Sequence, residues 1–378
     1  MKKTTRLFSL LLSLVVLLSF LTACGPSEIN DAGDKGESPK AEIVDGGSRK
    51  IVDIFGREVK IPADVKTCAA LGSAARLIVY AGGVDKIVAC TSMEVKGDPG
   101  MPFAYAHKEH FATCKEVATG GSKNTDNAEA LIELNPDVIF YQDSNTEALE
   151  KLAQKTSIPV IGVYGESFTS DKLTESVALI GNVLGTEEHA EKVVKAIKGW
   201  VKELDDLTKD IPDSEKPTVY PGAVSWSGGH GFGGTYINYA PFMAINALNL
   251  SDKLPGSGGV MVDFEQIMEW DPDIIFLNPG NMELVNKDYA ENPAMIDSLT
   301  AVKEGKVYAQ VNFNYYWCNM ELAIADAYYA GTIIYPEAFK DIDFEKKADE
   351  IFTTMVGMPY LKVLSDNNIG FGHIKIGK

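Results

Sequence analysis

The sequence predicts an α/β protein made of two similar lobes, each with a mainly parallel sheet flanked by helices, joined by one long helix. Three observations predict this architecture: an internal repeat, short buried strands that alternate with helical stretches, and one uninterrupted amphipathic helix between the repeats. The length of 378 residues suits about two domains of ordinary size.

The internal repeat consists of two segments of equal length that align without a gap, residues 127–140 and 263–276. Glu, Glu, Pro, Asp, Ile and Phe recur at matching places in the two copies. In each copy, apolar residues three and four apart predict a short amphipathic helix, which the Pro-Asp pair ends. The apolar runs that follow, 138–141 and 274–277, are typical of buried strands. Two copies of one helix–turn–strand unit indicate two similar lobes.

The start of the chain is typical of a bacterial export signal. Basic residues Lys2, Lys3 and Arg6 precede an apolar run over residues 7–21, and small residues lead to Cys24. The sequence Leu-Thr-Ala-Cys resembles a bacterial lipobox. That resemblance implies cleavage after residue 23, a lipid on Cys24 and an extracytoplasmic protein anchored to the cell membrane. A single anchor helix is the alternative interpretation, but the apolar run is short for one.

Composition argues against several classes of protein. A hydrophobic fraction of 45% and a charged fraction of 23% are ordinary for globular proteins and argue against wholesale disorder. The formal net charge of −18 argues against a nucleic-acid partner, because phosphate binding needs a basic surface. No long apolar run follows the start of the chain, which argues against a multi-span membrane protein. Residues 24–50 contain few apolar side chains, so we expect a flexible tether there.

The first lobe is expected over residues 51–185. Besides the strand of the first repeat, short strands are predicted over 66–71, 86–90 and 159–163, and helical stretches separate them. Alternation of this kind predicts a parallel sheet with helices on both faces.

The long helix is expected over residues 186–211, between the lobes. Thr186 is a suitable N-cap, acidic residues follow in the first turn, and apolar residues recur at helical spacing as far as Leu204. The second lobe is expected over 212–378, with strands over 218–221 and 306–310 and helices from Glu321 onward.

With these features the chain resembles the substrate-binding lipoproteins of iron-complex ABC importers, a family that handles ferric siderophores, haem and cobalamin. The resemblance rests on the lipobox, the tether, the opening stretch 51–62, the repeated Glu and Pro-Asp-x-Ile-Phe units and the long helix, and it spans about residues 49–350. It implies a class III periplasmic-binding-protein-like fold whose cleft shows little hinge closure. The implied partners are an ABC permease dimer with its ATPase and a small-molecule metal chelate. The implied protein is a monomer without an intrinsic cofactor, and it is not an enzyme.

Three alternatives stay open at this point. The leading interpretation is that the ligand is an iron complex, and the first alternative is that it is haem or a corrinoid. An enzyme on a chelatase-like two-lobe fold is the main rival from another class, although no nucleophile–base motif stands out. A sensory or adhesive surface lipoprotein is the third reading.

Ligand contacts are expected in the segments that follow the strands, because ligands of open α/β sheets gather beyond the carboxyl ends of the strands. In the first lobe, Gly72 and Ser73 precede a helical stretch and can present backbone N–H groups to an anion. Arg76 offers that anion a bidentate contact or else pairs with a surface carboxylate. The aperiodic stretch that contains Tyr105 and His107 is predicted as a loop whose side chains bind ligand or only pack the loop.

The second lobe contains a stretch crowded with glycine and aromatic residues, 220–239. The five glycines around His230 and Phe232 predict neither a regular strand nor a regular helix there. Trp226, His230 and Tyr236 are its candidate ligand contacts. His230 is the metal-ligand candidate; the alternatives are a hydrogen bond to an anionic ligand and a structural role. Neither a P-loop nor a nucleophile-elbow motif occurs in this stretch.

A third loop, residues 312–319, contains three adjacent aromatics, Tyr315, Tyr316 and Trp317. They cannot all point into one core, so we expect at least one of them at the cleft. Tyrosine phenolates bind ferric iron, and aromatic rings stack on a chelate, so both kinds of contact are considered. Asn319 is expected as the N-cap of the next helix. Since the sequence has no dense set of His or Cys ligands, we expect a pre-chelated metal rather than a bare ion.

Cysteines and two acidic residues complete the set of candidates. After Cys24, four cysteines remain, and Cys68 and Cys90 lie on neighbouring predicted strands. They are expected as small buried residues or, because export permits it, as a disulfide. In the family, a Glu on each lobe meets Arg residues of the permease. The matching positions are Glu129 and Glu265, near the start of the repeated helices, where an acid otherwise only favours the helix dipole.

Overall fold

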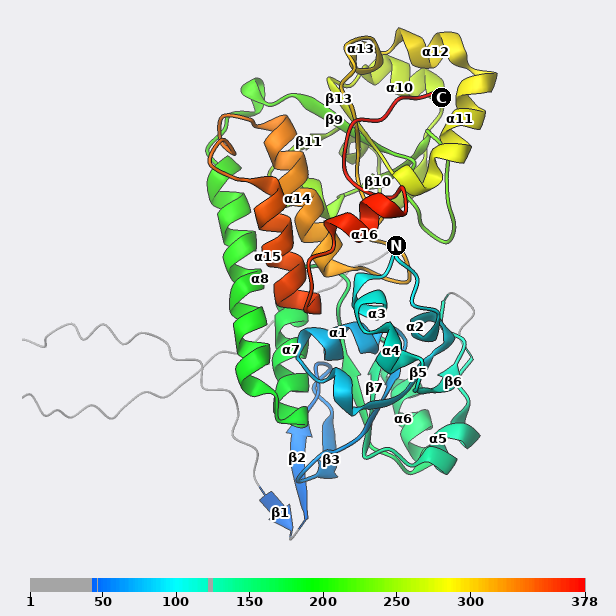
Figure 1. The fold of residues 1–378 in the computed structure, drawn as a ribbon, viewed down its shortest axis with the longest axis vertical. Helices are drawn as coiled ribbons and strands as arrows, with labels where there is room; N and C mark the ends of the chain where they lie inside the picture. Colours follow the sequence, from blue (N-terminus) through cyan, green and yellow to red (C-terminus); the bar gives the residue numbers. More distant parts are fainter. Residues whose placement is uncertain (1–42, 46, 122–124, 378) are drawn as a thin grey trace, which may run out of the picture. The chain divides into compact units, whose positions relative to one another are not determined.

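Strands that alternate with helices build two parallel sheets (Figure 1). The computed structural model describes residues 43–45, 47–121 and 125–377, which belong to the compact unit Ala41–Lys378. The predicted α/β class, with parallel sheets flanked by helices, is confirmed. The predicted export signal, the lipidation residue Cys24 and the predicted tether up to residue 42 lie outside the described residues.

A small antiparallel sheet opens the described chain. It contains β1 (Ile43–Asp45), β2 (Ser48–Val52) and β3 (Glu58–Pro62), in the order β1-β2-β3. The prediction of a tether up to residue 50 is therefore wrong at its end, because residues 48–52 pair with β3 along their whole length. Ile51 and Ile61 supply buried side chains, so a few apolar residues are enough to fix the ladder on the core.

The N-terminal lobe contains a five-stranded parallel sheet in the order β6-β5-β4-β7-β8. Four of these strands match the predicted ones to within two residues. The edge strand β6 was not predicted, because only half of its side chains are buried and its apolar pattern is weak. The strands are β4 (Cys68–Leu71), β5 (Ile87–Thr91), β6 (Lys115–Ala118), β7 (Val138–Gln142) and β8 (Val160–Val163).

Helices cover both faces of this sheet, so adjacent residues of one strand enter different cores. Phe140 packs in a core with α1 and α7, whereas its neighbour Ile139 packs in a second core with α5 and α6. This explains the continuous apolar runs that predicted the strands. The four helices are α1 (Ala74–Tyr80), α5 (Ala128–Leu134), α6 (Thr146–Thr156) and α7 (Asp171–Leu184).

Short helices replace a predicted loop after β5. The prediction of an irregular loop around Tyr105 and His107 is wrong. Pro102 begins a helix at the first helical position, which proline favours, and the buried Phe103 anchors that helix to the core. The helices are α2 (Ser92–Lys96), α3 (Pro102–Ala106) and α4 (Lys108–Phe111).

The C-terminal lobe contains a four-stranded parallel sheet in the order β11-β9-β13-β14 and a separate antiparallel pair, β10 with β12. Residues 223–233, which hold four of the five glycines around His230 and Phe232, form no helix or strand, as expected, and β10 begins at the fifth glycine, Gly234. Gly259 on β12 leaves the space that the Trp226 ring occupies. The strands are β9 (Thr218–Gly222), β10 (Gly234–Ile237), β11 (Leu248–Asn249), β12 (Gly258–Met261), β13 (Ile274–Leu277) and β14 (Val307–Ala309).

Both faces of the C-terminal sheet are also covered. Phe276 enters the large core that the two lobes share, whereas Ile275 and Leu277 enter a core of their own lobe with α10, α11, α12 and α13. The helices of this lobe are α9 (Ala240–Met243), α10 (Phe264–Trp270), α11 (Met282–Glu291), α12 (Pro293–Ser298) and α13 (Thr300–Lys303).

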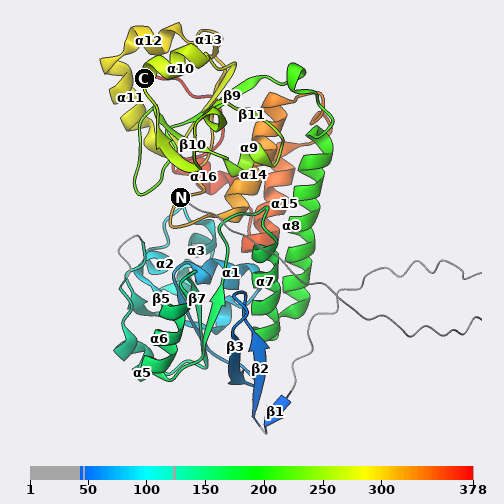
Figure 2. The same ribbon diagram turned by 180° about the vertical axis from the view of Figure 1, so that it is seen from behind.

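The predicted long helix between the lobes is present, and two further helices pack beside it. The long helix α8 (Glu187–Thr208) has α14 (Met320–Ile334) and α15 (Phe344–Val356) at its side (Figures 1 and 2). Since α15 packs on α1 and α3, the end of the chain is not confined to the second lobe. The hydroxyl of Tyr360, just before α16 (Leu361–Asp366), donates to a carbonyl of the N-terminal lobe.

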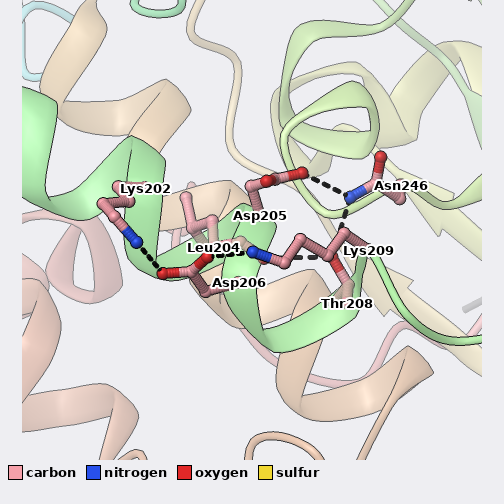
Figure 3. A network of polar contacts seen from close by, with 7 residues as sticks. All are labelled: Lys202, Leu204, Asp205, Asp206, Thr208, Lys209 and Asn246. Atoms are coloured by element: carbon pink, nitrogen blue, oxygen red, sulfur yellow. Dashed lines mark hydrogen bonds and ion pairs between the residues drawn. The ribbon is translucent and has the colours of Figure 1, made fainter.

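The two ends of α8 are held differently. At its start, Thr186 stands at the N-cap position, but its buried hydroxyl has no hydrogen-bond partner among the described residues. At its end, the amide of Asn246 donates to Asp205 at 3.0 Å and to the Thr208 hydroxyl at 3.1 Å (Figure 3). Asn246 follows α9, so these bonds fix the end of α8 to the second lobe.

The repeated unit has the same geometry in both lobes. The Asp137 carboxylate accepts a hydrogen bond from the Thr67 N–H at 2.9 Å, and the Asp273 carboxylate accepts one from the Thr218 N–H at 2.7 Å. In return, the hydroxyls of Thr67 and Thr218 accept from the N–H groups of Asp137 and Asp273, both at 3.2 Å. Each Pro-Asp pair therefore joins the start of its strand to the start of the neighbouring strand and fixes the parallel register.

Candidate functional site

A cavity of about 940 Å³ opens where residues of the two lobes meet. Residues within 225–229, 278–281 and 311–317 of the C-terminal lobe form most of its wall. Its side chains combine four aromatic rings, four carboxamides, two serine hydroxyls and, among the described residues, one carboxylate. The N-terminal lobe contributes Met93, Asp98, Gly100 and Gly121.

The switch point of the N-terminal sheet does not open into this cavity, because a side chain fills it. The chain order reverses between β4 and β7, where open α/β sheets usually bind ligands. Gly72 follows β4 with φ +64°, and a Cβ there would lie 2.5 Å from the Gln142 carbonyl oxygen. The Gly72 carbonyl accepts a hydrogen bond from the hydroxyl of Tyr316, which comes from the other lobe. Ser73 donates to the Gln142 side chain at 2.6 Å.

The equivalent point of the C-terminal sheet, between β9 and β13, faces the cavity. Ala223 follows β9 with φ +56°, a positive value like that of Gly72. The Ala223 carbonyl accepts from the Asn281 amide at 2.7 Å. The amides of Asn278 and Asn281 also donate to the Ser225 hydroxyl, at 3.2 and 2.9 Å. All three of these side chains line the cavity, so this switch point is a polar part of its wall.

The loop between β14 and α14 brings Tyr315, Tyr316 and Trp317 to the cavity. Trp317 is 42% exposed, whereas Tyr316 is only 7% exposed. Both have positive φ, +64° for Trp317 and +52° for Tyr316, which costs residues other than glycine about 1–2 kcal/mol each. Burial raises the pKa of Tyr316 well above its ordinary value, so the neutral phenol is favoured over the phenolate.

Asp98 brings a carboxylate to the wall of the cavity, beside Tyr315. One carboxylate oxygen accepts from the Gly100 N–H at 2.7 Å, and the other accepts from the Tyr315 hydroxyl at 3.4 Å. Burial and the neighbouring carboxylate raise the pKa of Tyr315. Asp98 was not predicted as a site residue, because nothing in its loop indicates that the fold places it opposite an aromatic of the other lobe.

Asn312 and Asn314 were also missed, and both line the cavity. Neither side chain makes a hydrogen bond to another residue in the described part of the chain, in contrast to Asn278 and Asn281. Their carboxamides are therefore available to donate to a ligand and to accept from it. Both asparagines are half-buried and flank the buried Phe313, but polar residues are ordinary in a loop, so the sequence did not single them out.

Arg76 does not line the cavity. Its side chain is fully buried, and its guanidinium donates to the Asn319 side chain at 3.2 Å and to the Tyr316 carbonyl at 2.5 Å. Among the residues described, no carboxylate forms an ion pair with it, so the surface pairing considered as its alternative role is not formed. Asn319 stands at the N-cap of α14, but its side chain does not cap the helix.

Three other predicted contacts, Tyr105, His107 and Tyr236, lie outside the lining of the cavity. Tyr105 packs edge-on against Tyr360, with ring centroids 5.8 Å apart. Burial lowers the pKa of His107, and its neighbour His110 adds to the effect. Tyr236 lies on β10 and packs edge-on against an adjacent tyrosine. The observed contacts of these side chains are structural, and their role as ligand contacts stays a prediction.

Trp226 lines the cavity, and His230 supports it. The two rings stack with centroids 3.6 Å apart, and the His230 Nε2–H donates to the Trp226 carbonyl at 3.0 Å. Within the described ranges, no group of three or more His, Cys, Asp or Glu side chains is arranged to hold a metal ion. The role of His230 as a metal ligand stays an untested prediction.

The four described cysteines, Cys68, Cys90, Cys114 and Cys318, are all free thiols. The Cys68–Cys90 disulfide considered from the sequence is therefore not formed. Both residues are fully buried on the neighbouring strands β4 and β5, as the alternative expectation stated.

Glu129 and Glu265 occupy the same position of the repeated unit, in the first turns of α5 and α10, and both are exposed. Three residues further along, each helix exposes an apolar side chain: Ile132 is 48% and Met268 is 38% exposed. Side chains three apart share a helix face. Each lobe thus presents an acid and an apolar residue together.

Comparisons with known proteins agree with this architecture. The family model described as periplasmic binding protein matches residues 68–310. The chain is 25% identical over 321 residues to the iron-uptake system-binding protein of Bacillus subtilis, which covers 79% of this chain and 89% of that protein. It is 22% identical over 328 residues to the molybdate-binding protein MolA of Haemophilus influenzae, which covers 80% of this chain and 90% of that protein.

Among solved structures, a periplasmic solute binding protein from Veillonella parvula superposes with a TM-score of 0.68 at 21% identity, over 85% of this chain and 96% of that one. In the described residues, no helix combines the length and the apolar character needed to cross a membrane. The family model spans the sheets of both lobes, and the resemblance drawn from the sequence is confirmed. The chain belongs to the periplasmic binding protein family of type III, whose members are substrate-binding components of ABC importers and not enzymes.

Proposed function

We propose that this protein is an extracytoplasmic lipoprotein that captures a metal chelate, an iron complex, in the cavity between its lobes and delivers it to an ABC importer. The observation that carries the proposal is the wall of the cavity, in which four aromatic rings meet two carboxamides without internal partners. The protein binds the complex and performs no chemistry on it.

The proposal of a chelate follows from the chemistry of these side chains. A chelated metal presents an organic periphery, because the chelator already fills its coordination sites. Trp226, Tyr315 and Trp317 offer ring faces and edges to such a periphery, and Asn312 and Asn314 offer donors and acceptors that orient it. The relative named for iron uptake supports iron as the metal.

Haem or a corrinoid is the second candidate ligand. A flat macrocycle has large apolar faces, and Trp317 and Trp226 at the wall of the cavity favour stacking on such faces. The two candidates differ in shape and not in the site that they occupy, so one binding experiment separates them.

Delivery is proposed to use the exposed acids of the repeated helices. Glu129 on α5 and Glu265 on α10 would each meet a basic side chain of one permease subunit, and equivalent positions on two similar lobes suit a two-fold partner. A lipid on Cys24 would hold the monomeric protein at the membrane surface near that permease.

Calorimetric titration of the purified protein tests the proposed ligand class. The probes are a ferric trihydroxamate, a ferric tricatecholate, haem and cyanocobalamin, with molybdate and free Ni²⁺ as controls. One class of chelate should bind saturably with one molecule per protein. Trp317→Ala should weaken that binding roughly 10- to 100-fold, because a buried aromatic contact contributes about 1.5–3 kcal/mol.

Leu284→Ala is the matched control for this substitution. Leu284 is an apolar residue of α11 with 37% exposure that does not line the cavity, so its truncation should leave the affinity unchanged. Binding of molybdate or Ni²⁺ in preference to all chelates would contradict the proposed ligand class. Binding of no chelate at all would contradict it as well.

A further inference from the structure

Arg76 is a buried cation whose side-chain hydrogen bonds, among the described residues, go to the loop of the other lobe. It lies on α1 of the N-terminal lobe with no exposed surface. Its Nη2 donates to the Tyr316 carbonyl, its Nε donates to the Asn319 side chain, and its guanidinium carbon lies 4.7 Å from the centre of the Phe103 ring. Burial of a guanidinium without a paired carboxylate is costly, so the bonds to the loop must compensate.

Two buried carboxyl groups, those of Glu94 and Glu321, interact electrostatically with Arg76, but neither takes the place of its hydrogen bonds to the loop. Glu94 and Glu321 are both fully buried, and burial raises the pKa of each, to about 7 for Glu94. The Glu94 carboxylate accepts from the N–H and the hydroxyl of Thr91, and Glu321 accepts from Tyr80. These acids are therefore held by neutral donors, and the guanidinium remains directed at the loop.

Asn319 extends the reach of Arg76 along the loop. While its carbonyl oxygen accepts from Arg76, its amide donates to the carbonyls of Phe313 at 3.2 Å and Tyr315 at 3.0 Å. Arg76 and Asn319 together bind the carbonyls of Phe313, Tyr315 and Tyr316. These three groups belong to the segment that presents the aromatic rings to the cavity.

The backbone of this segment needs such support. Tyr316 and Trp317 are two consecutive residues with positive φ, a conformation that side chains other than glycine disfavour and that persists only where the surroundings fix it. The hydroxyl of Tyr316 is held in turn by Gly72 and lies 3.1 Å from the Thr91 hydroxyl, both in the N-terminal lobe. The bonds that Tyr316 makes with Arg76, Gly72 and Thr91 all cross from one lobe to the other.

We propose that Arg76 is a positioning residue of the ligand site: it holds Tyr316 and Trp317 in their strained conformation, so that the rings of the C-terminal loop face the cavity. The inference rests on the proposed function in that the cavity is the ligand site. The N-terminal lobe then contributes to ligand affinity through a residue, Arg76, that does not contact the ligand.

Hydrogen exchange of the ligand-free protein tests the positioning directly. In Arg76→Met, the amides of residues 313–319 should exchange at least tenfold faster than in the wild type, while those of α8 keep their rates. Arg57→Met is the matched control, since Arg57 is a partly buried arginine that donates to the Val160 carbonyl away from the loop. It should leave the rates of residues 313–319 unchanged.

Rescue and affinity separate positioning from a general loss of stability. Arg76→Lys keeps the charge and one donor for the Tyr316 carbonyl but loses the fork, so its exchange rates should lie between those of the wild type and Arg76→Met. For a ferric trihydroxamate or haem, whichever binds the wild type, Arg76→Met should weaken binding at least tenfold, although Arg76 does not line the cavity.

Unchanged exchange of residues 313–319 in Arg76→Met, or equal acceleration in every segment, would overturn the inference. If Arg76→Met does not fold, Asn319→Ala decides in the same way, because it removes the bonds to Phe313 and Tyr315. The exchange measurement needs no ligand. A wild type that binds neither probe would therefore remove the proposed function without affecting this result.

Discussion

Gly72 and Ala223 stand at equivalent points of the two lobes, directly after the first strand of each parallel sheet, and both have left-handed backbone conformations. In the N-terminal lobe, the Gly72 carbonyl binds the Tyr316 hydroxyl, and the phenol fills the switch point. In the C-terminal lobe, the Ala223 carbonyl binds Asn281, and the switch point remains part of the cavity wall.

The difference shows that two lobes with similar sheets use their switch points in different ways. The N-terminal lobe supplies only four of the nineteen residues that line the cavity, and its switch point holds a side chain of its partner lobe. The C-terminal lobe supplies the aromatics and the carboxamides. The first lobe therefore acts mainly as a platform that fixes the loop of the second, and the second lobe supplies most of the wall of the proposed ligand site.

Substitution of the proposed docking acids, Glu129 and Glu265, tests whether the two lobes contribute equally to uptake at a surface away from the ligand. Simultaneous Glu129→Ala and Glu265→Ala substitution should lower uptake of the bound chelate more than 100-fold in cells, while calorimetry shows unchanged ligand affinity. Each single substitution should have a partial effect of similar size. Glu175→Ala, an exposed acid on α7, is the control and should leave uptake unchanged. A large loss of ligand affinity in the double variant would contradict the docking role.

The pH dependence of stability that Glu94 causes tests whether water is excluded from the N-terminal switch point, which Tyr316 fills. Glu94 is fully buried beside Thr91, and burial raises its pKa to about 7, compared with about 4.5 in the unfolded chain. Its contribution to stability is therefore complete below about pH 4.5 and is lost as pH rises through 7. The shift corresponds to about 3 kcal/mol at most.

Urea unfolding between pH 5 and 8 measures this contribution. The free energy of unfolding of the wild type should fall relative to that of Glu94→Gln as pH rises. A difference between the two proteins that stays constant over this range would show that the carboxyl group is hydrated, contrary to the filled switch point.

Gly72 and Ala223 provide a matched pair of substitutions. Gly72→Ala should lower the free energy of unfolding by about 2 kcal/mol or more, because its φ is positive and the added Cβ would meet the Gln142 carbonyl oxygen. Ala223→Gly should change stability by less than about 1 kcal/mol, because relief of strain is offset by greater freedom of the unfolded chain. Thermal unfolding measures both. Equal effects of the two substitutions would refute the difference between the switch points.

Asp137 and Asp273 make equivalent hydrogen bonds in the two lobes, so their substitution should have equal effects on stability. Each carboxylate accepts hydrogen bonds from the threonine at the start of the neighbouring strand. Asp137→Ala and Asp273→Ala should each lower the free energy of unfolding by about 1 kcal/mol, as lost hydrogen bonds of partly exposed groups do. Denaturant titration measures both variants. A loss of stability in only one of them would show that the equivalent hydrogen bonds of the two lobes do not contribute equally to stability.

Much of the fold could be predicted because buried parallel strands are continuous apolar runs. The strands at Val138 and Ile274 were evident from the repeat, and the long helix from its apolar stripe. The edge strand β6 and the glycine-rich pair β10–β12 were not, since their pairing depends on partners distant in sequence. The position of α14 and α15 beside α8 is likewise a result of tertiary packing.

The site could be predicted only in part. Tyr315, Tyr316 and Trp317 stood out because three adjacent aromatics cannot share one core, and all three line the cavity. The carboxamides and Asp98 carry no such signal, since polar residues are ordinary in loops. The direction of Arg76 toward the other lobe could not be predicted, because its partners, the Tyr316 carbonyl and the Asn319 side chain, lie some 240 positions away in the chain.

The central claim is that the ligand binds in the cavity beside the aromatic loops. Four proteins that each retain a single tryptophan test it most directly, because quenching by a bound iron chelate or macrocycle decreases steeply with distance. Trp226 and Trp317 line the cavity, whereas Trp200 lies on α8 and Trp270 on α10. Titration with the chelate that binds the wild type should quench the Trp226 and Trp317 proteins saturably and much more strongly than the other two. Equal or stronger quenching of Trp200 or Trp270 would contradict the claim.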